Sequence, residues 1–176
     1  MEEPDKLKCF EQVVLPDLGG AYNLAHWLIR NEHDAEDVVQ GACLRALNFD
    51  GFRGGDPRAW LLTIVRNCCY TWLKQNRRQG LPTTLDEEIH TAEEHSQSPE
   101  AQVLGRAGAR RVKDASEELP AEFRESIVLR ELEAMSYKEI AAICGIPVGT
   151  VMSRLARARR RLERHLTGAV KQGALP

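Results

Sequence analysis

The chain has little that would let it form a sheet, cross a membrane or leave the cell. Aromatic residues are only 6% of its 176 residues, and no segment shows the alternation of apolar and polar residues that is typical of β-strands. No uncharged apolar run approaches the roughly 20 residues that a membrane-spanning helix needs. The N-terminus is acidic and lacks the basic and apolar parts of a secretory signal. These absences favour an all-α, cytoplasmic protein.

Residues that bind metals or carry out catalysis are also scarce. The chain has five cysteines and no CxxC spacing, and a disulfide between Cys68 and Cys69 would be strained in a helical segment. We interpret the cysteines as reduced, buried, small apolar residues. His90 and His95 enclose acidic residues, but their spacing fits no common zinc motif. No phosphate-binding loop, nucleophile elbow or metalloprotease motif is present. The sequence therefore predicts a protein that is not an enzyme and needs no metal or cofactor.

The charge of the chain is distributed unevenly. Its 24 Lys and Arg against 26 Asp and Glu give a formal net charge of −2, which by itself would not favour binding to nucleic acid. However, arginines crowd residues 154–164, whereas residues 79–105 contain no Lys or Arg. Local charge decides where DNA can bind, so the basic C-terminal segment is the candidate.

That segment, residues 136–162, has the layout of a helix-turn-helix. Ser136 and Glu139 match a capping box at a helix start. Gly145 can end that helix in the left-handed conformation, and Pro147 is placed to begin the next one. On the second helix an apolar stripe faces hydroxyls and arginines on the opposite side. The stripe consists of Val148, Val151, Leu155, Ala158 and Leu162.

The outward face of the second helix suits the major groove of DNA, because Arg pairs bidentately with guanine and hydroxyls hold phosphates. The alternative is a solvated basic helix that packs on a neighbour and binds nothing. The capped helix and tight turn before it favour the DNA reader. Arg159 lies on the packing side of the stripe, so we expect it to form an ion pair or a phosphate contact.

Three helices are predicted before the linker: one over residues 10–32, one that Asp34 caps and that runs to residue 49, and one from Pro57 to about Arg78 with Asp56 as its cap. Together they predict a compact N-terminal domain over residues 1–79. Their expected inner faces consist of Leu24, Ala25 and Leu28; Ala35, Val39, Ala42 and Ala46; and Leu61, Ile64, Val65, Cys68 and Trp72.

Residues 80–105 are predicted to be a flexible acidic linker, since prolines and acidic residues replace the apolar periodicity there. About twenty extended residues span on the order of 60 Å, enough for the two domains to bind well-separated points. The alternative is an acidic cap folded onto the basic helix, which would make the free protein autoinhibited. The C-terminal domain covers residues 106–176. Its helix after Pro120 offers an apolar face of Phe123, Ile127, Val128 and Leu132.

These motifs, in this order, resemble the extracytoplasmic function group of bacterial sigma factors, the two-domain members of the sigma-70 family. The resemblance extends over nearly the whole chain. It is carried by DAEDVVQ at 34–40, FRG at 52–54, WLLTIVRN at 60–67, LPAEFRESIVLRELEAMSYKEIA at 119–141 and IPVGTVMSRLARARRRL at 146–162.

The resemblance implies that the helix at 34–40 docks on the clamp helices of the largest subunit of RNA polymerase through Glu36, Asp37 and Gln40. Without it, these residues would be read as a solvated helix face. The resemblance also implies that the long helix and the loop before it open the −10 element and capture a base. The residues implied there are Arg53, Arg66, Asn67, Lys74, Arg77 and Arg78.

The second helix of the helix-turn-helix would contact the −35 element through Thr150, Ser153, Arg154, Arg157 and Arg160. Met152 stands where relatives often carry a basic residue, and Thr71 stands where they often carry Asp. These two departures bear on the promoter sequence that the chain prefers.

The resemblance implies an alternative sigma factor that binds core RNA polymerase and promoter DNA, with an anti-sigma factor as inhibitor. A different class of function stays open: a helix-turn-helix regulator whose sigma-like N-terminal half is only a protein-interaction domain. Asp37, Gln40 and Asn67 discriminate between the two, because only a sigma factor needs all three.

Overall fold

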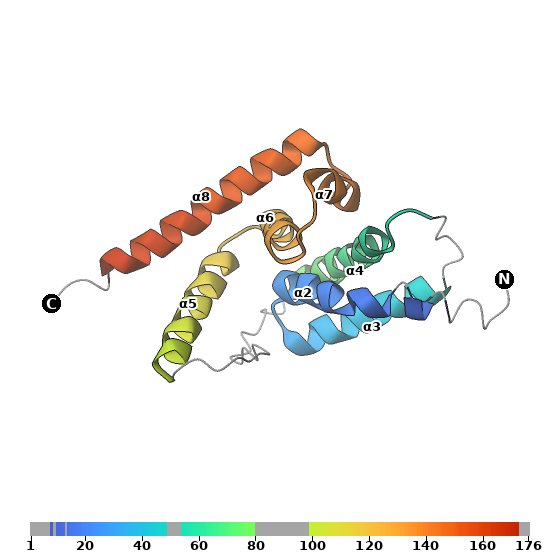
Figure 1. The fold of residues 1–176 in the computed structure, drawn as a ribbon, viewed down its shortest axis with the longest axis horizontal. Coiled ribbons are helices and arrows are strands. Elements are labelled where there is room, and N and C mark those ends of the chain that lie inside the picture. Colours follow the sequence, from blue (N-terminus) through green and yellow to red (C-terminus); the bar gives the residue numbers. More distant parts are fainter. Residues whose placement is uncertain (1–7, 9, 13, 49–53, 80–98, 173–176) are drawn as a thin grey trace.

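The computed structural model describes residues 8, 10–12, 14–48, 54–79 and 99–172. Within these ranges every regular element is helical, in agreement with the predicted all-α fold (Figure 1). The elements are η1 (Leu15–Asp17), α2 (Leu18–Ile29), α3 (Glu32–Asn48), α4 (Pro57–Gln79), α5 (Pro99–Glu117), α6 (Ala121–Ile127), the π-helical turn η2 (Val128–Leu132), α7 (Tyr137–Cys144) and α8 (Val148–Gln172).

Helices α2, α3 and α4 all contact one another and form the N-terminal unit. The apolar residues predicted to face inward on α2 and α3 are all buried, and so are Leu61 and Val65 on α4. Ile64, Cys68 and Trp72 are partly buried at the edge of the same core. A short amphipathic helix is only marginally stable alone in water, so each of these helices is stabilised by packing its apolar face against the other two.

Two predicted helix boundaries are wrong, and each has a local cause. The helix expected over 10–32 is interrupted by η1 and ends at Ile29, because Arg30 takes a left-handed conformation with φ 65°. The next helix begins at Glu32, where Asn31 and not Asp34 is the cap: Asn31 Oδ1 accepts a hydrogen bond from the Asp34 amide at 2.9 Å. Asp34 instead adds negative charge to the first turn, which the helix dipole favours.

The start of α4 agrees with the prediction. The Arg58 amide donates to Asp56 Oδ1 at 3.0 Å, and Pro57 occupies the first helical position. The helix extends to Gln79, one residue beyond the predicted end.

The C-terminal unit contains the predicted helix-turn-helix. The Ser136 hydroxyl accepts a hydrogen bond from the Glu139 amide at 3.2 Å, and the Glu139 carboxylate accepts one from the Ser136 amide at 2.6 Å. Gly145 ends α7 with φ 65°, and α8 starts at Val148 after a bend of 101°. Val151, Leu155 and Ala158 of the apolar stripe are buried. At the two ends of the stripe, Val148 is exposed and Leu162 is partly buried.

The helix that precedes the helix-turn-helix departs from its predicted apolar face. After Ile127 the helix widens into a π-turn, in which the Glu133 amide donates to the carbonyl of Val128, five residues back, at 3.1 Å. The wider turn shifts the phase of the side chains that follow it. Leu132, predicted to be inside, is 52% exposed, and Glu133 is only 4% exposed.

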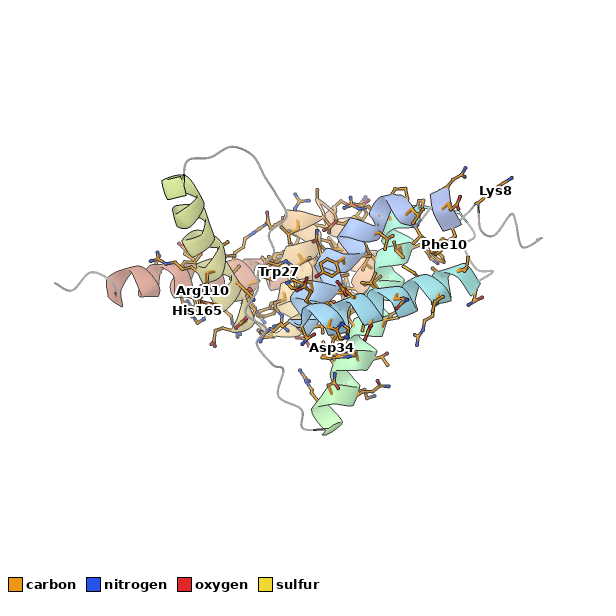
Figure 2. All side chains as sticks on the ribbon, turned by 90° about the horizontal axis from the view of Figure 1, so that it is seen from below. Lys8, Phe10, Trp27, Asp34, Arg110 and His165 are labelled. Carbon is orange, nitrogen blue, oxygen red and sulfur yellow. The ribbon has the colours of Figure 1, made fainter. Side chains whose placement is uncertain are left out.

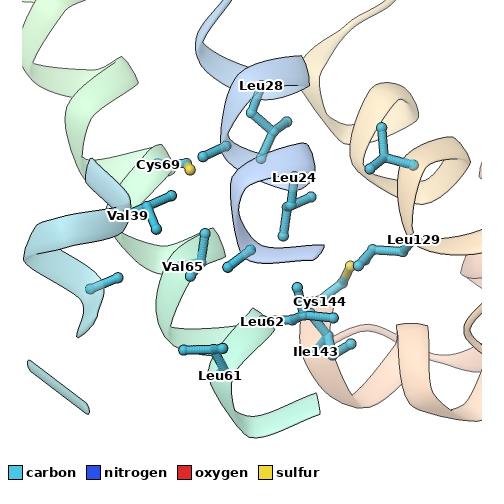
Figure 3. Packing of buried hydrophobic residues seen from close by; sticks show 14 of the residues in the cluster. Leu24, Leu28, Val39, Leu61, Leu62, Val65, Cys69, Leu129, Ile143 and Cys144 are labelled. Carbon is cyan, nitrogen blue, oxygen red and sulfur yellow. The ribbon is translucent and has the colours of Figure 1, made fainter. Parts of the chain in front are cut away.

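The two units pack against each other through one hydrophobic cluster. Helix α2 contacts α6 and η2, and α4 contacts α7. Leu62 of α4 belongs to the same buried cluster as Leu129 of η2 and Ile143 and Cys144 of α7 (Figure 3). The structure therefore shows the two units closed on each other.

Helix α5 begins at Pro99, inside the range predicted to be linker, and contacts α8. The pair projects from the packed centre, with Arg110 and His165 on the projecting part (Figure 2). The rest of the predicted linker, residues 80–98, lies outside the described residues. The alternative in which this segment folds onto the basic helix therefore stays a prediction.

Candidate nucleic-acid and polymerase interfaces

The outer face of α3 presents the three residues predicted to bind polymerase. Glu36, Asp37 and Gln40 are all exposed, because Ala35 and Val39 on the opposite side are held in the core. Residues three and four positions apart on a helix share a face, and Gln40 is three positions after Asp37 and four after Glu36. The structure therefore brings these three side chains together as an acidic, hydrogen-bonding surface that a partner can reach.

The predicted −10 residues divide into two groups. Asn67, Lys74 and Arg77 are exposed on α4. Asn67 and Lys74, seven positions apart, share one face of the helix. Arg53 and the side chain of Arg78 lie outside the described residues. Arg66 belongs to the other group, since it points toward the C-terminal unit.

Arg66 is bound by a buried carboxylate. Its Nε donates to Glu125 Oε2 at 2.7 Å and its Nη2 donates to Glu125 Oε1 at 3.3 Å, and its guanidinium lies 4.5 Å from the ring centroid of Tyr70. Burial alone lowers the pKa of Arg66, but hydrogen bonding and attraction to Glu125 outweigh burial and raise it. In this structure Arg66 is partly buried between the two units.

The predicted −35 residues also fall into two groups, one on the surface of α8 and one directed toward Glu125. Ser153, Arg157 and Arg160 are exposed on α8, and Thr150 is partly buried, its carbonyl accepting a hydrogen bond from the Ser153 hydroxyl at 3.0 Å. Arg154 instead donates through Nη1 to Glu125 Oε1 at 3.3 Å. A single carboxylate thus contacts one arginine from each predicted DNA surface.

Arg159 forms an ion pair with Glu131 of η2, with Nη2 2.6 Å from Oε1. An ion pair was one of the two roles that its position on the packing side of α8 predicted. Both side chains are about half exposed, so the pair contributes little stability.

A second buried carboxylate lies between the units. Glu133 Oε2 is 2.5 Å from Arg58 Nη2, and Glu133 Oε1 accepts a hydrogen bond from Asn23 Nδ2 at 3.0 Å. Arg58 also lies 3.5 Å from Asp17. None of these residues was predicted to have a role, because the pairs join positions 75 and 110 residues apart in the chain.

Two further arginines reach across the interface. Arg30 donates to the carbonyl of Glu117, and Arg124 Nη2 lies 3.5 Å from the carbonyl of Leu28. Burial, and the charge of Arg30 next, lower the pKa of Arg124 to about 10. In the sequence, this interface is signalled only by two charged residues, Arg124 and Glu125, which lie between the apolar residues Phe123 and Ile127.

The described residues contain no group of three or more His, Cys, Asp or Glu able to hold a metal ion. His90 and His95 lie outside them. Cys69 and Cys144 are buried thiols, and burial raises the pKa of each to about 12. Over the same part of the chain, no single helix is both long and apolar enough to cross a membrane.

Comparison with known families places two matches along this chain. The family described as Sigma-70 region 2 matches residues 15–79, and the family described as Sigma-70, region 4 matches residues 109–162. The first match covers η1 to α4, which carries the acidic α3 face. The second covers the helix-turn-helix and the two buried carboxylates.

Several bacterial proteins are similar over most of the chain. The ECF RNA polymerase sigma-E factor of Haemophilus influenzae is 36% identical over 148 residues, which are 80% of this chain and 77% of that protein. The Escherichia coli K12 sigma-E factor is 34% identical over 147 residues, 79% and 77% of the two proteins. The Mycolicibacterium smegmatis factor SigE is 32% identical over 160 residues, and the match spans 89% of this chain but only 61% of that protein.

Two solved structures share the arrangement of helices. The sigma factor RpoE in complex with the anti-sigma factor NepR, from Bartonella quintana, is 32% identical, with a TM-score of 0.72 over 91% of this chain and 98% of that one. CnrH in complex with the cytosolic domain of CnrY is 26% identical, with a TM-score of 0.63 over 92% and 90% of the two chains.

Proposed function

Because the chain belongs to the sigma-70 family of sigma factors, in its extracytoplasmic function group, we propose that it binds core RNA polymerase and directs promoter-specific initiation as an alternative sigma factor. The observation that carries this proposal is the order of regions 2 and 4, together with the exposed acidic face of α3 and the exposed residues Asn67 on α4 and Arg157 on α8. The initiation chemistry itself belongs to the polymerase. The chain accordingly acts in the cytoplasm, where polymerase and promoter DNA are.

The acidic face of α3 is the proposed polymerase contact. Glu36 and Asp37 supply charge, and the Gln40 amide supplies both a donor and an acceptor. Complementary charge at such a face favours encounter and orientation more than raw affinity. The face lies on the side of α3 that points away from the core.

The N-terminal unit would also hold the separated −10 strand. A captured base needs polar groups at its edges, which Asn67 offers, and the strand needs cations along its backbone. Lys74 and Arg77 are exposed further along the same helix. Arg53 and Arg78 would add to this charge on grounds of the family resemblance.

Helix α8 is the proposed −35 reader. Arg157 and Arg160 project from its exposed side, with Ser153 one turn before Arg157. Arginine on a helix in the major groove can pair with guanine, and such a bidentate pair discriminates against the wrong base by about 1–3 kcal/mol. Thr150 and Ser153 suit phosphate contacts, which fix the register of the helix.

An anti-sigma factor is the proposed inhibitory partner. One of the two similar structures is the sigma factor RpoE in complex with the anti-sigma factor NepR, and the other is CnrH in complex with the cytosolic domain of CnrY. The arrangement of helices that this chain shares with both proteins over more than nine-tenths of its length supports a comparable partner.

Binding to purified core polymerase tests the proposal. Asp37→Arg reverses a charge at the centre of the α3 face and should abolish co-purification with core enzyme while the circular-dichroism melting curve stays unchanged. Asp114→Arg is the matched control, because Asp114 is also exposed on a helix but lies on α5. Retention of core binding by Asp37→Arg would favour a regulator that acts on DNA alone.

A further inference from the structure

We propose that Met152 of α8 contacts the C5 methyl group of a thymine in the −35 element, so that this chain selects an A·T pair there by an apolar contact. Val148, one turn earlier on the same helix, lies beside Met152 and belongs to the same contact. This inference rests on the proposed function, because it specifies one of the bases that the −35 reader recognises.

Met152 and Val148 are apolar side chains that the fold leaves at the surface. Met152 is 54% exposed and Val148 is 38% exposed, whereas Val151 and Leu155 of the same helix are buried. Helix α8 runs along one edge of the molecule (Figure 1). Single exposed hydrophobic residues are ordinary on protein surfaces. The meaning of this pair therefore comes from its position on a helix that is proposed to read DNA.

The neighbours of Met152 belong to the reading face of α8. Ser153 follows it directly and Arg157 comes one turn after Ser153, and both are exposed. Gly149 and Ala156, one turn before and one turn after Met152, are exposed and small, and a Cβ on Gly149 would meet nothing within 4 Å. These small residues let the helix backbone approach another surface closely, with the longer Met152 side chain between them.

Met152 also lies near the start of α8, the second helix of the helix-turn-helix. In this motif the N-terminal residues of the recognition helix are those that contact base edges in the major groove. An exposed side chain at this point is therefore placed to contact a base, whereas residues further along the helix are better placed for the phosphate backbone.

The chemistry of methionine leaves one base for it to recognise. A thioether has no hydrogen-bond donor and is only a weak acceptor, so Met152 cannot pair with the polar edge of guanine, adenine or cytosine. The C5 methyl group of thymine is the apolar group that the major groove presents. A flexible, polarisable side chain adapts well to such a group. Burying the methyl group against Met152 removes it from water, which favours thymine.

The charge around Met152 favours DNA over a protein as the partner that covers it. Arg157, Arg160, Arg161 and Arg164 are all exposed on the same helix. Cations beside a reading face bind the phosphates that flank the groove. Duplex DNA fits both features, because it offers a methyl group inside the groove and negative charge along its edges.

The test compares thymine with uracil in one promoter. Holoenzyme made from core polymerase and the full chain binds a duplex fragment that it protects from nuclease, and each thymine of the upstream element, on either strand, is replaced in turn by deoxyuridine. Uracil keeps every hydrogen-bonding group of thymine and lacks only the methyl group. We expect one replacement to weaken binding by about fourfold, the effect of losing the burial of one methyl group.

Met152→Ala should remove this preference, so that the thymine and uracil fragments bind equally well. Alanine is the better helix former, so this variant should fold, and circular dichroism checks that it does. Leu132→Ala is the matched control, because Leu132 is 52% exposed but lies on η2, outside α8. It should keep the preference of about fourfold. Arg157→Ala should weaken binding to both fragments by the same factor.

The same ratio of thymine to uracil affinities in the unchanged chain and in Met152→Ala would overturn the proposal, and so would a protected upstream element without an A·T pair. Loss of core polymerase binding by Met152→Ala would also overturn it, because Met152 would then contact protein. A failure of the proposed function is distinct: the unchanged chain then does not bind core polymerase at all, and the proposal for Met152 fails with it.

Discussion

Arg66 Nε lies 2.7 Å from Glu125 Oε2, although the two residues are 59 positions apart and belong to the two separate sigma regions. This bond joins the units at a point that is 18% exposed on the arginine side and fully buried on the glutamate side. It makes the closed arrangement of the chain a specific one, because a buried charge has few alternative partners.

Glu125→Gln should destabilise the chain strongly, because it leaves two guanidiniums facing an uncharged amide. Breaking a buried ion pair by removing one partner typically costs about 3–5 kcal/mol. Urea unfolding monitored by circular dichroism measures the loss. Glu131→Gln, which breaks the exposed pair with Arg159, should change the free energy of unfolding by less than about 1 kcal/mol. Equal effects of the two variants would show that Glu125 contributes no more than a surface pair.

Ser136→Ala should lower the free energy of unfolding by about 1 kcal/mol, the usual loss on removing a helix N-cap. Ser153→Ala is the control, since its hydroxyl bonds within a helix already formed. The hydrogen bond from Ser136 lowers the pKa of Glu139 below its ordinary value of 4.5. The stability that this hydrogen bond adds to the fold is therefore present above pH 4.5 and is lost as the pH falls further. The difference between Ser136→Ala and the unchanged chain should therefore shrink in acid.

The buried thiols predict sensitivity to alkali. Burial raises the pKa of Cys144 from 9.0 to about 12, so folding favours its neutral form, and this contribution is complete below pH 9 and lost as the pH rises toward 12. Cys144→Ala should make unfolding less dependent on pH across that window. At pH 8, mass spectrometry should find partly buried Cys43 alkylated before Cys69 and Cys144. Early labelling of Cys144 in the folded chain would contradict this.

Arg157→Ala and Arg160→Ala should weaken binding of the holoenzyme to promoter DNA. Each lost phosphate contact lowers the slope of log affinity against log salt by about 1, and a lost base contact relaxes preference at one position. Filter binding at several salt concentrations separates the two roles. Arg159→Ala is the control, because that guanidinium is held by Glu131. An equal loss in the control would point to general charge.

Local signals in the sequence predicted the helix starts at Pro57 and Ser136 and the turn at Gly145, because caps and glycine act through neighbours in the chain. They did not distinguish Asn31 from Asp34 as a cap, since both residue types serve equally well there. The apolar stripes placed the cores of both units for a similar reason. Helical periodicity is a property of the segment alone.

The π-turn and the ion pairs between the two units could not be predicted from local signals. A π-turn is a rare interruption of an α-helix, and the phase shift that exposes Leu132 and buries Glu133 follows from it. Pairs such as Arg58 with Glu133 join residues 75 positions apart and leave no local pattern. The roles of the exposed site residues came from the family resemblance, and the positions of Asp37 and Asn67 on the surface are compatible with those roles.

Sequencing of the DNA that the reconstituted holoenzyme protects shows whether this chain gives core polymerase its promoter specificity. Core polymerase with this chain, incubated with fragments of the source genome, should protect a set of sites that share two short sequence elements, with thymines in the downstream element reactive to permanganate. Core enzyme alone should protect no such set. A chain that binds core polymerase yet selects no common sequence and opens no site would not be a sigma factor.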